Sequence, residues 1–196
     1  MALTQLREWL LAPYFENSGE NGCKKSSHAS HLSNVTCPLH RRMLVISGND
    51  DFCEAAIRSV QAFVDEVSSI SVVNFAGDTL KGKNRKQVLG SECDIATLDC
   101  RDSFKPGDVM AVAGIVKRSG CLILICPALS EWVNNISVSF LSEGFTLTQS
   151  RYLERFIKHL RNNDYVALHT EEKTTLPDTA MYRISQGVTS NVYRGS

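Results

Sequence analysis

The sequence predicts an α/β fold, with a single three-layer, doubly wound domain and a mostly parallel sheet of about five strands. Two observations lead to this prediction. Apolar runs of strand length alternate along the chain with segments in which apolar residues recur at helical spacing. One of these runs, Cys121–Cys126, is apolar at every position, as strands covered on both faces tend to be. The 196 residues, 43% of them hydrophobic, suffice for one domain with a full core.

The chain begins with a predicted helix and a polar connector, which together make up residues 1–40. Leu3, Leu6 and Leu10 fall on one face of the helix, and Pro13 is expected to stop it. The connector, Glu16–Pro38, is rich in Ser, Asn and Gly and shows no apolar periodicity. We therefore expect a flexible segment before the folded domain.

The α/β domain is expected to occupy residues 41–176. Its first strand, Met43–Ile46, is followed by a turn and by a helix whose apolar residues, within Phe52–Val67, share one face. The spacing of Asp51 and Glu54 resembles a capping box at the start of this helix. A strand followed by a capped helix is the first unit of a doubly wound fold.

The second and third strands are predicted at Ile70–Phe75 and Asp94–Leu98, with a loop and a short helix around Arg85–Leu89 between them. Pro106 lies near the start of the next helix, and Gly120 is expected just past its end. Four apolar residues share one face of this helix: Val109, Val112, Ala113 and Val116.

Two further strands, Cys121–Cys126 and Tyr165–Leu168, complete the predicted sheet. Between them, Ser150 can cap another helix. The apolar residues of that helix are Leu153, Phe156, Ile157 and Leu160. The last segment, 177–196, is interpreted as either an edge strand or a tail.

The loop after the second strand spells most of a phosphate-binding P-loop. The stretch GDTLKGKN, Gly77–Asn84, has the pattern G-x-x-x-x-G-K, but Asn84 stands where Ser or Thr would ligate Mg²⁺. Asp78 also adds a negative charge to the phosphate cradle. Three interpretations are therefore open: a nucleotide site, an exposed turn with solvated lysines, or a local patch that binds RNA phosphates. The residues of this RNA-binding patch are Lys81, Lys83, Arg85 and Lys86.

The turn SGNDD after the first strand is where a doubly wound fold usually binds phosphate. It has one glycine, and Asp50 and Asp51 would repel an anion, which argues against a dinucleotide site. Together with Asp99, these acids resemble the Mg²⁺-binding pocket of a response-regulator receiver domain, although Pro127 and Ala128 stand where a receiver carries a hydroxyl. A free-standing receiver-like or nucleotide-binding α/β domain is therefore the alternative function. Helix caps and solvated loop acids explain these residues more simply.

The connector also contains residue types that bind zinc. Cys23, His28, His31 and Cys37 have the spacing C-x₄-H-x₂-H-x₅-C, which differs from that of zinc fingers. The sequence therefore predicts no metal site, and whether the connector binds metal stays open. Spacing alone assembles no Ser-His-Asp or paired-glutamate set, so no catalytic residue is predicted either.

Charge and cysteine content exclude several classes of protein. Lys and Arg number 21, as do Asp and Glu, so an RNA contact needs a local basic patch because no overall positive field is available. We see no signal-peptide pattern, and the apolar runs are too short to span a membrane. Seven cysteines, several of them in apolar segments, are typical of reduced, buried thiols. A cytoplasmic protein is therefore expected.

Three segments carry a resemblance that spacing does not show: RRMLVISGNDDFC (Arg41–Cys53), QVLGSECDIATLDCRDSFKPGDVMAVAGIVKRSGCLILICPALSEW (Gln87–Trp132) and RYLERFIKHL (Arg151–Leu160). They resemble the N-terminal domain of bacterial tRNA(Met) cytidine acetyltransferase, a family that forms N4-acetylcytidine. The resemblance covers about Arg41 to Leu168. The middle segment keeps the family's order and spacing at Leu89-Gly90, Asp99, Phe104, Gly114, Gly120 and Glu131-Trp132.

In that family the full enzyme acetylates the wobble cytidine of elongator tRNA(Met), using acetyl-CoA and the hydrolysis of ATP or GTP. Its chemistry lies downstream, in a helicase-like module with the P-loop, an acetyl-CoA-binding domain and a C-terminal region that helps to hold tRNA. The resemblance implies that this segment is a non-catalytic accessory domain without a cofactor of its own. Its implied partners are tRNA(Met) and the helicase-like and acetyltransferase domains, so that it contacts tRNA or packs on the helicase-like module. It also implies that Gly77–Asn84 is a basic loop whose P-loop spelling is coincidental.

Overall fold

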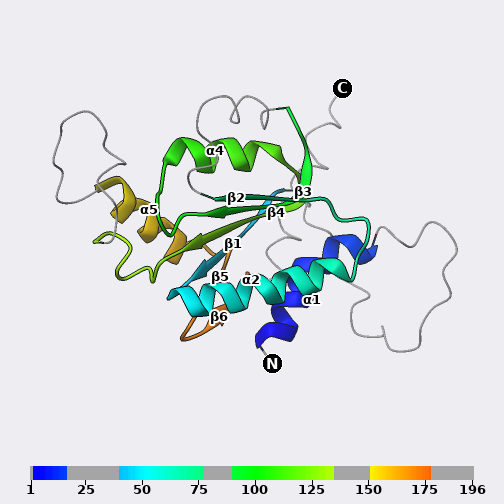
Figure 1. Cartoon of the computed structure of the whole chain (residues 1–196), viewed down its shortest axis with the longest axis horizontal. Coiled ribbons are helices and arrows are strands. Elements are labelled where there is room, and N and C mark those ends of the chain that lie inside the picture. The colour runs from blue at the N-terminus through cyan, green and yellow to red at the C-terminus, as the bar shows by residue number, and fades with distance from the viewer. Residues whose placement is uncertain (1, 17–39, 77–89, 135–150, 178–196) are drawn as a thin grey trace, which may run out of the picture.

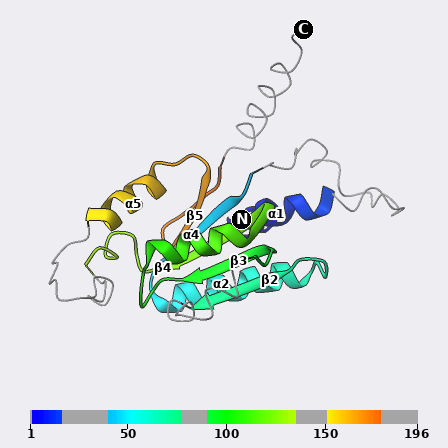
Figure 2. The ribbon, with the colours of Figure 1, turned by 90° about the horizontal axis from the view of Figure 1, so that it is seen from above.

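The computed structural model describes residues 2–16, 40–76, 90–134 and 151–177. These residues form an α/β domain in three layers, with one sheet between helices on either face (Figures 1 and 2). The strands are β1 (Arg42–Ser47), β2 (Val72–Ala76), β3 (Cys93–Asp99), β4 (Val116–Cys126), β5 (Val166–Thr170) and β6 (Thr174–Thr175). The helices are α1 (Ala2–Glu16), α2 (Asp50–Asp65), α4 (Pro106–Ile115) and α5 (Arg151–Arg161). The predicted fold class is confirmed.

The strand order in the sheet is β2-β3-β4-β1-β5-β6. Neighbouring strands from β2 to β5 are parallel, and β6 runs antiparallel beside β5. The described sheet therefore has six strands, whereas about five were predicted. The additional strand, Thr174–Thr175, is only two residues long and too short to carry an apolar pattern.

The direction of each connection decides which face of the sheet its helix covers. The chain crosses the sheet one way from β1 to β2, through α2, and the other way from β3 to β4 and from β4 to β5, through α4 and α5. Because parallel crossovers are right-handed, α2 covers one face and α4 and α5 cover the opposite face (Figure 1). Helix α1 packs beside α2.

Two apolar layers flank the sheet, and β4 contributes to both. Leu122 and Leu124 pack toward α4 and α5, whereas Ile123 and Ile125 pack toward α1 and α2. All four side chains are at most 5% exposed. This arrangement confirms that Cys121–Cys126 is covered on both faces and explains why it is apolar throughout.

Helix α1 does not stop at Pro13, as the sequence predicted, but continues to Glu16. Proline cannot donate the hydrogen bond that the carbonyl of Trp9 would receive in a regular helix. The buried guanidinium of Arg42 donates in its place, from Nη1 to the Trp9 carbonyl at 2.5 Å and from Nη2 to the Leu10 carbonyl at 2.9 Å. The guanidinium carbon also lies 4.8 Å from the centre of the Trp9 ring.

This contact binds α1 to the core of the α/β domain. Leu6 and Leu10 are fully buried, whereas Leu3, which was predicted on the same face, is 44% exposed. The connector, the predicted helix at Arg85–Leu89, Ser150 and residues 178–196 lie outside the described residues. The division of the chain into residues 1–40, 41–176 and 177–196 therefore stays a prediction.

Helix α4 ends earlier than predicted. It stops at Ile115, and Val116 is the first residue of β4, so Gly120 lies inside a strand and does not follow a helix end. The register between β3 and β4 shifts at this point. Ser119 has a φ of 64°, and a Cβ on Gly120 would lie only 2.4 Å from the carbonyl oxygen of Asp94. The glycine permits the bulge, which no helix-end rule could predict.

The cap of α2 is also different from the predicted one. Asn49, not Asp51, caps the helix, since its Oδ1 accepts a hydrogen bond from the backbone N–H of Phe52 at 2.8 Å. Asp51 lies in the first turn, where its charge favours the helix dipole. Glu54 does not return to the cap but accepts a hydrogen bond from Arg101 at 2.9 Å.

The described cysteines match the expectation of reduced thiols. All five are buried and free: Cys53, Cys93, Cys100, Cys121 and Cys126. Burial raises the pKa of the Cys121 thiol to about 11, which keeps it protonated and unreactive. Cys23 and Cys37 lie outside the described residues.

Candidate nucleic-acid interface

A crevice of about 500 Å³ lies at the carboxyl ends of β1, β3 and β4, where α/β folds usually bind ligands. Its lining includes four carboxylates and one guanidinium: Asp50, Asp102, Glu131, Glu171 and Arg101. An anionic ligand such as a nucleotide phosphate would meet net negative charge in this crevice.

The position that a phosphate would take at α2 is occupied by a side chain of the protein. Oε1 of Glu171 accepts a hydrogen bond from the backbone N–H of Asn49 at 2.6 Å. A Cβ on Gly48 would lie 2.8 Å from the same oxygen, so the glycine lets this carboxylate approach. That the SGNDD turn is not a dinucleotide site stays a prediction.

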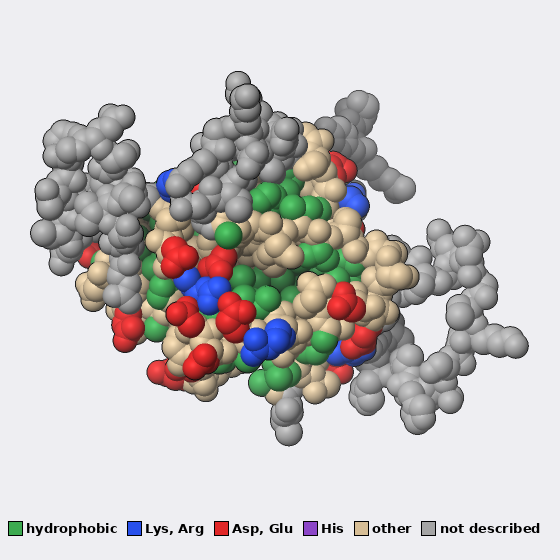
Figure 3. All heavy atoms as spheres, viewed as in Figure 1, with side chains coloured by type: hydrophobic (Ala, Val, Ile, Leu, Met, Phe, Trp, Pro, Cys, Tyr) green, Lys and Arg blue, Asp and Glu red, His purple; other side chains and the backbone are tan. Residues whose placement is uncertain are grey.

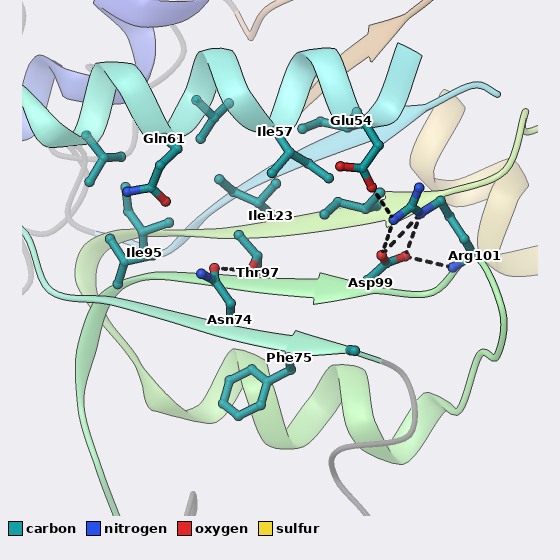
Figure 4. Close-up of a pocket in the computed structure, with 16 residues that line it drawn as sticks. Glu54, Ile57, Gln61, Asn74, Phe75, Ile95, Thr97, Asp99, Arg101 and Ile123 are labelled. Carbon is teal, nitrogen blue, oxygen red and sulfur yellow. Dashed lines mark hydrogen bonds and ion pairs between the residues drawn. The ribbon is translucent and has the colours of Figure 1, made fainter. Parts of the chain in front are cut away.

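The acids that resemble a receiver pocket do meet in space, but they surround a cation. Arg101 donates to Asp99 from Nη2 at 2.6 Å and from Nε at 3.0 Å, and to Asp50 from Nη1 at 3.2 Å. Its third partner is Glu54, and Figure 4 shows the guanidinium between the Glu54 and Asp99 carboxylates. Asp51 is exposed and does not join them. These hydrogen bonds, first of all those to Asp99, raise the pKa of Arg101.

Arg101 therefore takes the place between the carboxylates that a Mg²⁺ ion would need. In the part of the chain that the structure describes, no three His, Cys, Asp or Glu side chains are placed to hold a metal ion. The sequence predicted this arrangement only in part, because the spacing of the residues does not indicate that the side chain of Arg101 folds back and donates to the Asp99 carboxylate.

A mainly apolar groove of about 430 Å³ separates α2 from the edge of the sheet (Figure 4). Ile57 of α2 and Ile95 of β3 line it, and Oγ1 of Thr97 donates to Oδ1 of Asn74 at 2.5 Å on its sheet side. Figure 3 shows this hollow as hydrophobic surface beside a basic cluster ringed by acidic side chains. Residues of α2 line one side of the groove and residues of β2, β3 and β4 line the other, so α2 leaves this part of the sheet open.

The predicted RNA-binding residues Lys81, Lys83, Arg85 and Lys86 lie outside the described residues, as does the whole Gly77–Asn84 loop. Their role stays a prediction. The same holds for the Cys/His connector.

The structure places a different set of cations on α5. Leu153, Ile157 and Leu160 face the core, as predicted. Arg151, Arg155 and Lys158 follow one another at i, i+4 and i+7, which puts them in one stripe on the opposite, exposed face. We call this stripe the α5 basic face.

The charges of the α5 basic face are not neutralised within the described residues. Ion pairs there engage Arg7, Arg101 and Lys117, whereas none joins a carboxylate to Arg151, Arg155 or Lys158. Arg161 flanks the stripe, and Glu154 is the one acid of the helix. The patch was missed in the sequence because the helix was interpreted from its apolar face alone.

Exposed aromatic rings lie at both ends of α5. Tyr152 is 49% exposed and stacks on Phe156 with ring centroids 6.2 Å apart. Tyr165 is 47% exposed and lies edge-on to His40 at 6.1 Å. Cations in a row with exposed rings at either end are the chemistry that binds nucleic acid, because cations contact phosphates and rings stack on bases.

Comparison with known proteins identifies the family. The family described as "tRNA(Met) cytidine acetyltransferase TmcA, N-terminal" matches residues 26–171. The chain is 26% identical over 158 residues to the tRNA(Met) cytidine acetyltransferase TmcA of Haloferax volcanii, covering 76% of this chain and 21% of the relative. It is 23% identical over 172 residues to the protein of the same name from Nitrosococcus halophilus, covering 81% of this chain and 23% of the relative.

The chain thus spans about a fifth of the length of these relatives. No helix in the described ranges combines the length and apolar character that a membrane crossing requires. Because the family match covers most of the chain, and because the predicted α/β domain is the one that the structure forms, the chain belongs to the family of tRNA(Met) cytidine acetyltransferase TmcA N-terminal domains.

Proposed function

We propose that this chain is the N-terminal accessory domain of a tRNA(Met) cytidine acetyltransferase and that it contacts tRNA through the α5 basic face. In this proposal the whole enzyme forms N4-acetylcytidine at the wobble position in the cytoplasm. Acetyl-CoA and ATP or GTP bind to its helicase-like and acetyltransferase domains, and the domain described here performs no catalysis by itself. The family match and the relatives' names support the reaction.

The observation that carries the RNA contact is the α5 basic face. It carries three exposed cations about one helical turn apart: Arg151, Arg155 and Lys158. The opposite face of the helix is buried in the core. A rigid row of cations that make no ion pair with the described carboxylates binds a phosphate backbone without ordering new protein structure, so little entropy is lost on binding.

The acidic crevice supports the same assignment by elimination, because it is unsuited to a phosphate backbone. Its carboxylates repel phosphates, and Glu171 and Arg101 are held by hydrogen bonds to Asn49 and Asp99. Groups held in this way stabilise the fold, so we assign the tRNA contact to the α5 basic face and not to the crevice.

A second role, packing against the helicase-like module of the same polypeptide, is favoured by the apolar groove between α2 and the sheet edge. Apolar hollows of this kind are typical of surfaces between domains. The two roles use different faces and are compatible.

Binding of labelled tRNA(Met), measured by fluorescence anisotropy at low and moderate salt, tests the RNA contact. We expect the triple variant Arg151→Gln, Arg155→Gln, Lys158→Gln to weaken binding and to reduce the log–log salt slope by about 2–3. The matched control changes three exposed cations elsewhere, Arg58→Gln, Arg118→Gln and Lys173→Gln, and removes the same charge. Equal losses in both variants would show that only net charge matters and would overturn the assignment of the face.

Two further arms separate the alternatives. A variant in which Lys81, Lys83, Arg85 and Lys86 are changed to Gln tests the loop that the sequence predicted. Mg²⁺-ATP binding is measured in parallel, and tight ATP binding that Lys83→Ala abolishes, without tRNA binding, would favour the nucleotide-binding alternative.

A further inference from the structure

A cavity of about 360 Å³ opens where α5 ends and the chain turns into β5. It shares Arg161 with the helix that carries the basic face, and Figure 2 shows α5 and β5 side by side at this end of the sheet. Its volume is within the range of small-ligand sites and is large enough for a nucleobase.

The residues that line this cavity include an apolar group, which we call the wall, and a polar group, which we call the rim. The wall comes from β5 and the segment after β6: Val166, Leu168, Leu176 and Pro177. The rim consists of Asn163, Asp164 and Thr175. Oδ1 of Asn163 accepts the backbone N–H of Tyr165 at 2.9 Å, so its NH₂ group is the part that is left to donate outward. The rim thus offers amide and hydroxyl donors and a carboxylate acceptor.

We propose that this cavity receives one unpaired nucleotide of an RNA strand whose neighbouring phosphates lie on the α5 basic face. A nucleobase has two apolar faces and a polar edge, which matches an apolar wall with a polar rim. Arg161, which also lines the cavity, binds the phosphate of the same nucleotide, and no carboxylate pairs with Arg161 within the described residues. The inference rests on the proposed function, because it extends the same RNA contact.

Tyr165 adds a second base contact at the same turn. Its ring is 47% exposed and lies edge-on to His40. Tyr165 follows the end of α5, the helix that carries Arg161, and directly precedes β5. A base next to the bound nucleotide can stack on this ring. The site therefore recognises an unpaired strand or loop, and a continuous duplex, whose bases stay stacked, does not enter it.

The test compares two RNA probes and one free nucleotide. The two RNA probes are a short unstructured oligonucleotide and a blunt duplex, and the free nucleotide is cytidine monophosphate. Each is titrated against the chain. Thr175→Trp fills the cavity from an exposed position on the edge strand, and Thr175→Val at the same position is the matched control that leaves it open. We expect Thr175→Trp to weaken binding of the unstructured strand about tenfold and to leave duplex binding unchanged.

The outcomes separate this inference from the proposed function. If the α5 triple variant weakens binding of both RNA probes while Thr175→Trp weakens binding of neither, the RNA contact of the basic face is supported and the nucleotide cavity is contradicted. If the α5 triple variant behaves as wild type, the proposed function fails with it. If cytidine monophosphate binds as tightly as the strand, the cavity is a free-nucleotide site and the RNA inference is wrong.

A photocrosslink gives a second readout that needs no substitution. A 4-thiouridine in the unstructured strand should crosslink to the peptide that contains residues 163–177. Crosslinks confined to other peptides would contradict the inference even if Thr175→Trp failed to fold.

Discussion

Glu171, in the turn between β5 and β6, accepts a hydrogen bond at 2.6 Å from the backbone N–H of Asn49, the residue that caps α2. The two residues are 122 positions apart in the sequence. The contact places a carboxylate of the protein where α/β folds of this type bind a phosphate.

Glu171→Ala should expose the N-terminus of α2. We expect a loss of about 1 kcal/mol in the free energy of unfolding, because a charge-assisted but solvent-exposed hydrogen bond is removed. Added inorganic phosphate should then raise the melting temperature of the variant and leave wild type unchanged. Urea denaturation and thermal melts measure both effects. Glu172→Ala, at the exposed neighbouring position, is the control, and identical behaviour of the two variants would contradict the prediction.

Arg42 and Pro13 should be energetically coupled. Arg42→Met leaves the carbonyls of Trp9 and Leu10 without their donor, and we expect a destabilisation of about 3 kcal/mol. Pro13→Ala restores a backbone N–H that can reach the Trp9 carbonyl, so the same Arg42 substitution should then cost about 1 kcal/mol less. Urea denaturation of the four members of the double-mutant cycle measures this difference. Strict additivity would show that Arg42 does not replace the missing helix hydrogen bond.

Two glycine substitutions should have opposite effects. Gly120→Ala places a Cβ 2.4 Å from the backbone oxygen of Asp94, and we expect a loss of about 2–3 kcal/mol. Gly114→Ala places a Cβ in α4 with no atom within 4 Å, and we expect a gain of about 0.5–1 kcal/mol from the lower entropy of the unfolded chain. Thermal melts with two-state analysis distinguish them. A neutral Gly120→Ala would mean that the bulge is not closely packed.

The stability of the domain should depend on pH through Asp94. Burial alone would raise the pKa of this carboxyl, but hydrogen bonds from Ser71 and Lys117 outweigh it and lower the pKa below the ordinary 3.8. A lowered folded-state pKa means that the stabilisation is complete above the unfolded-state value and is lost as the pH falls through the folded-state value. We expect wild type to lose stability relative to Asp94→Asn below pH 3.8. Parallel unfolding curves over that range would contradict this assignment.

The sequence predicted much of the fold because strands and helices leave local patterns. The apolar run Cys121–Cys126 and the core positions Leu153, Ile157 and Leu160 of α5 are found where the pattern put them. Errors lie at element ends, where a single contact decides. Pro13 stays inside a helix because the distant Arg42 donates to the Trp9 carbonyl that the proline leaves without a donor, and Val116 starts a strand because Gly120 allows a bulge.

The candidate site was predicted less well. Asp50 and Asp99 belonged to the receiver-like alternative, and each of them contacts the guanidinium of Arg101, which was not foreseen. The spacing of the cations on the α5 basic face is visible in the sequence, but the face was missed because the helix was interpreted from its apolar residues alone. The cavity beside it is not visible in the sequence, because it is formed jointly by the end of α5, β5 and the segment after β6.

The sequence by itself determined the fold class, the order of the elements and the faces that they bury, since these depend on neighbours a few residues away. Only the tertiary structure decided that Glu171 occupies the phosphate position of α2, that Arg101 donates to the surrounding acids and that Arg161 lines a cavity together with β5 and the segment after β6. The contacts of Glu171 with Asn49 and of Arg101 with Asp50 and Glu54 join residues that are far apart in the chain and are brought together by the order of the strands. Their chemistry therefore follows from the packing of the sheet, which no local pattern encodes.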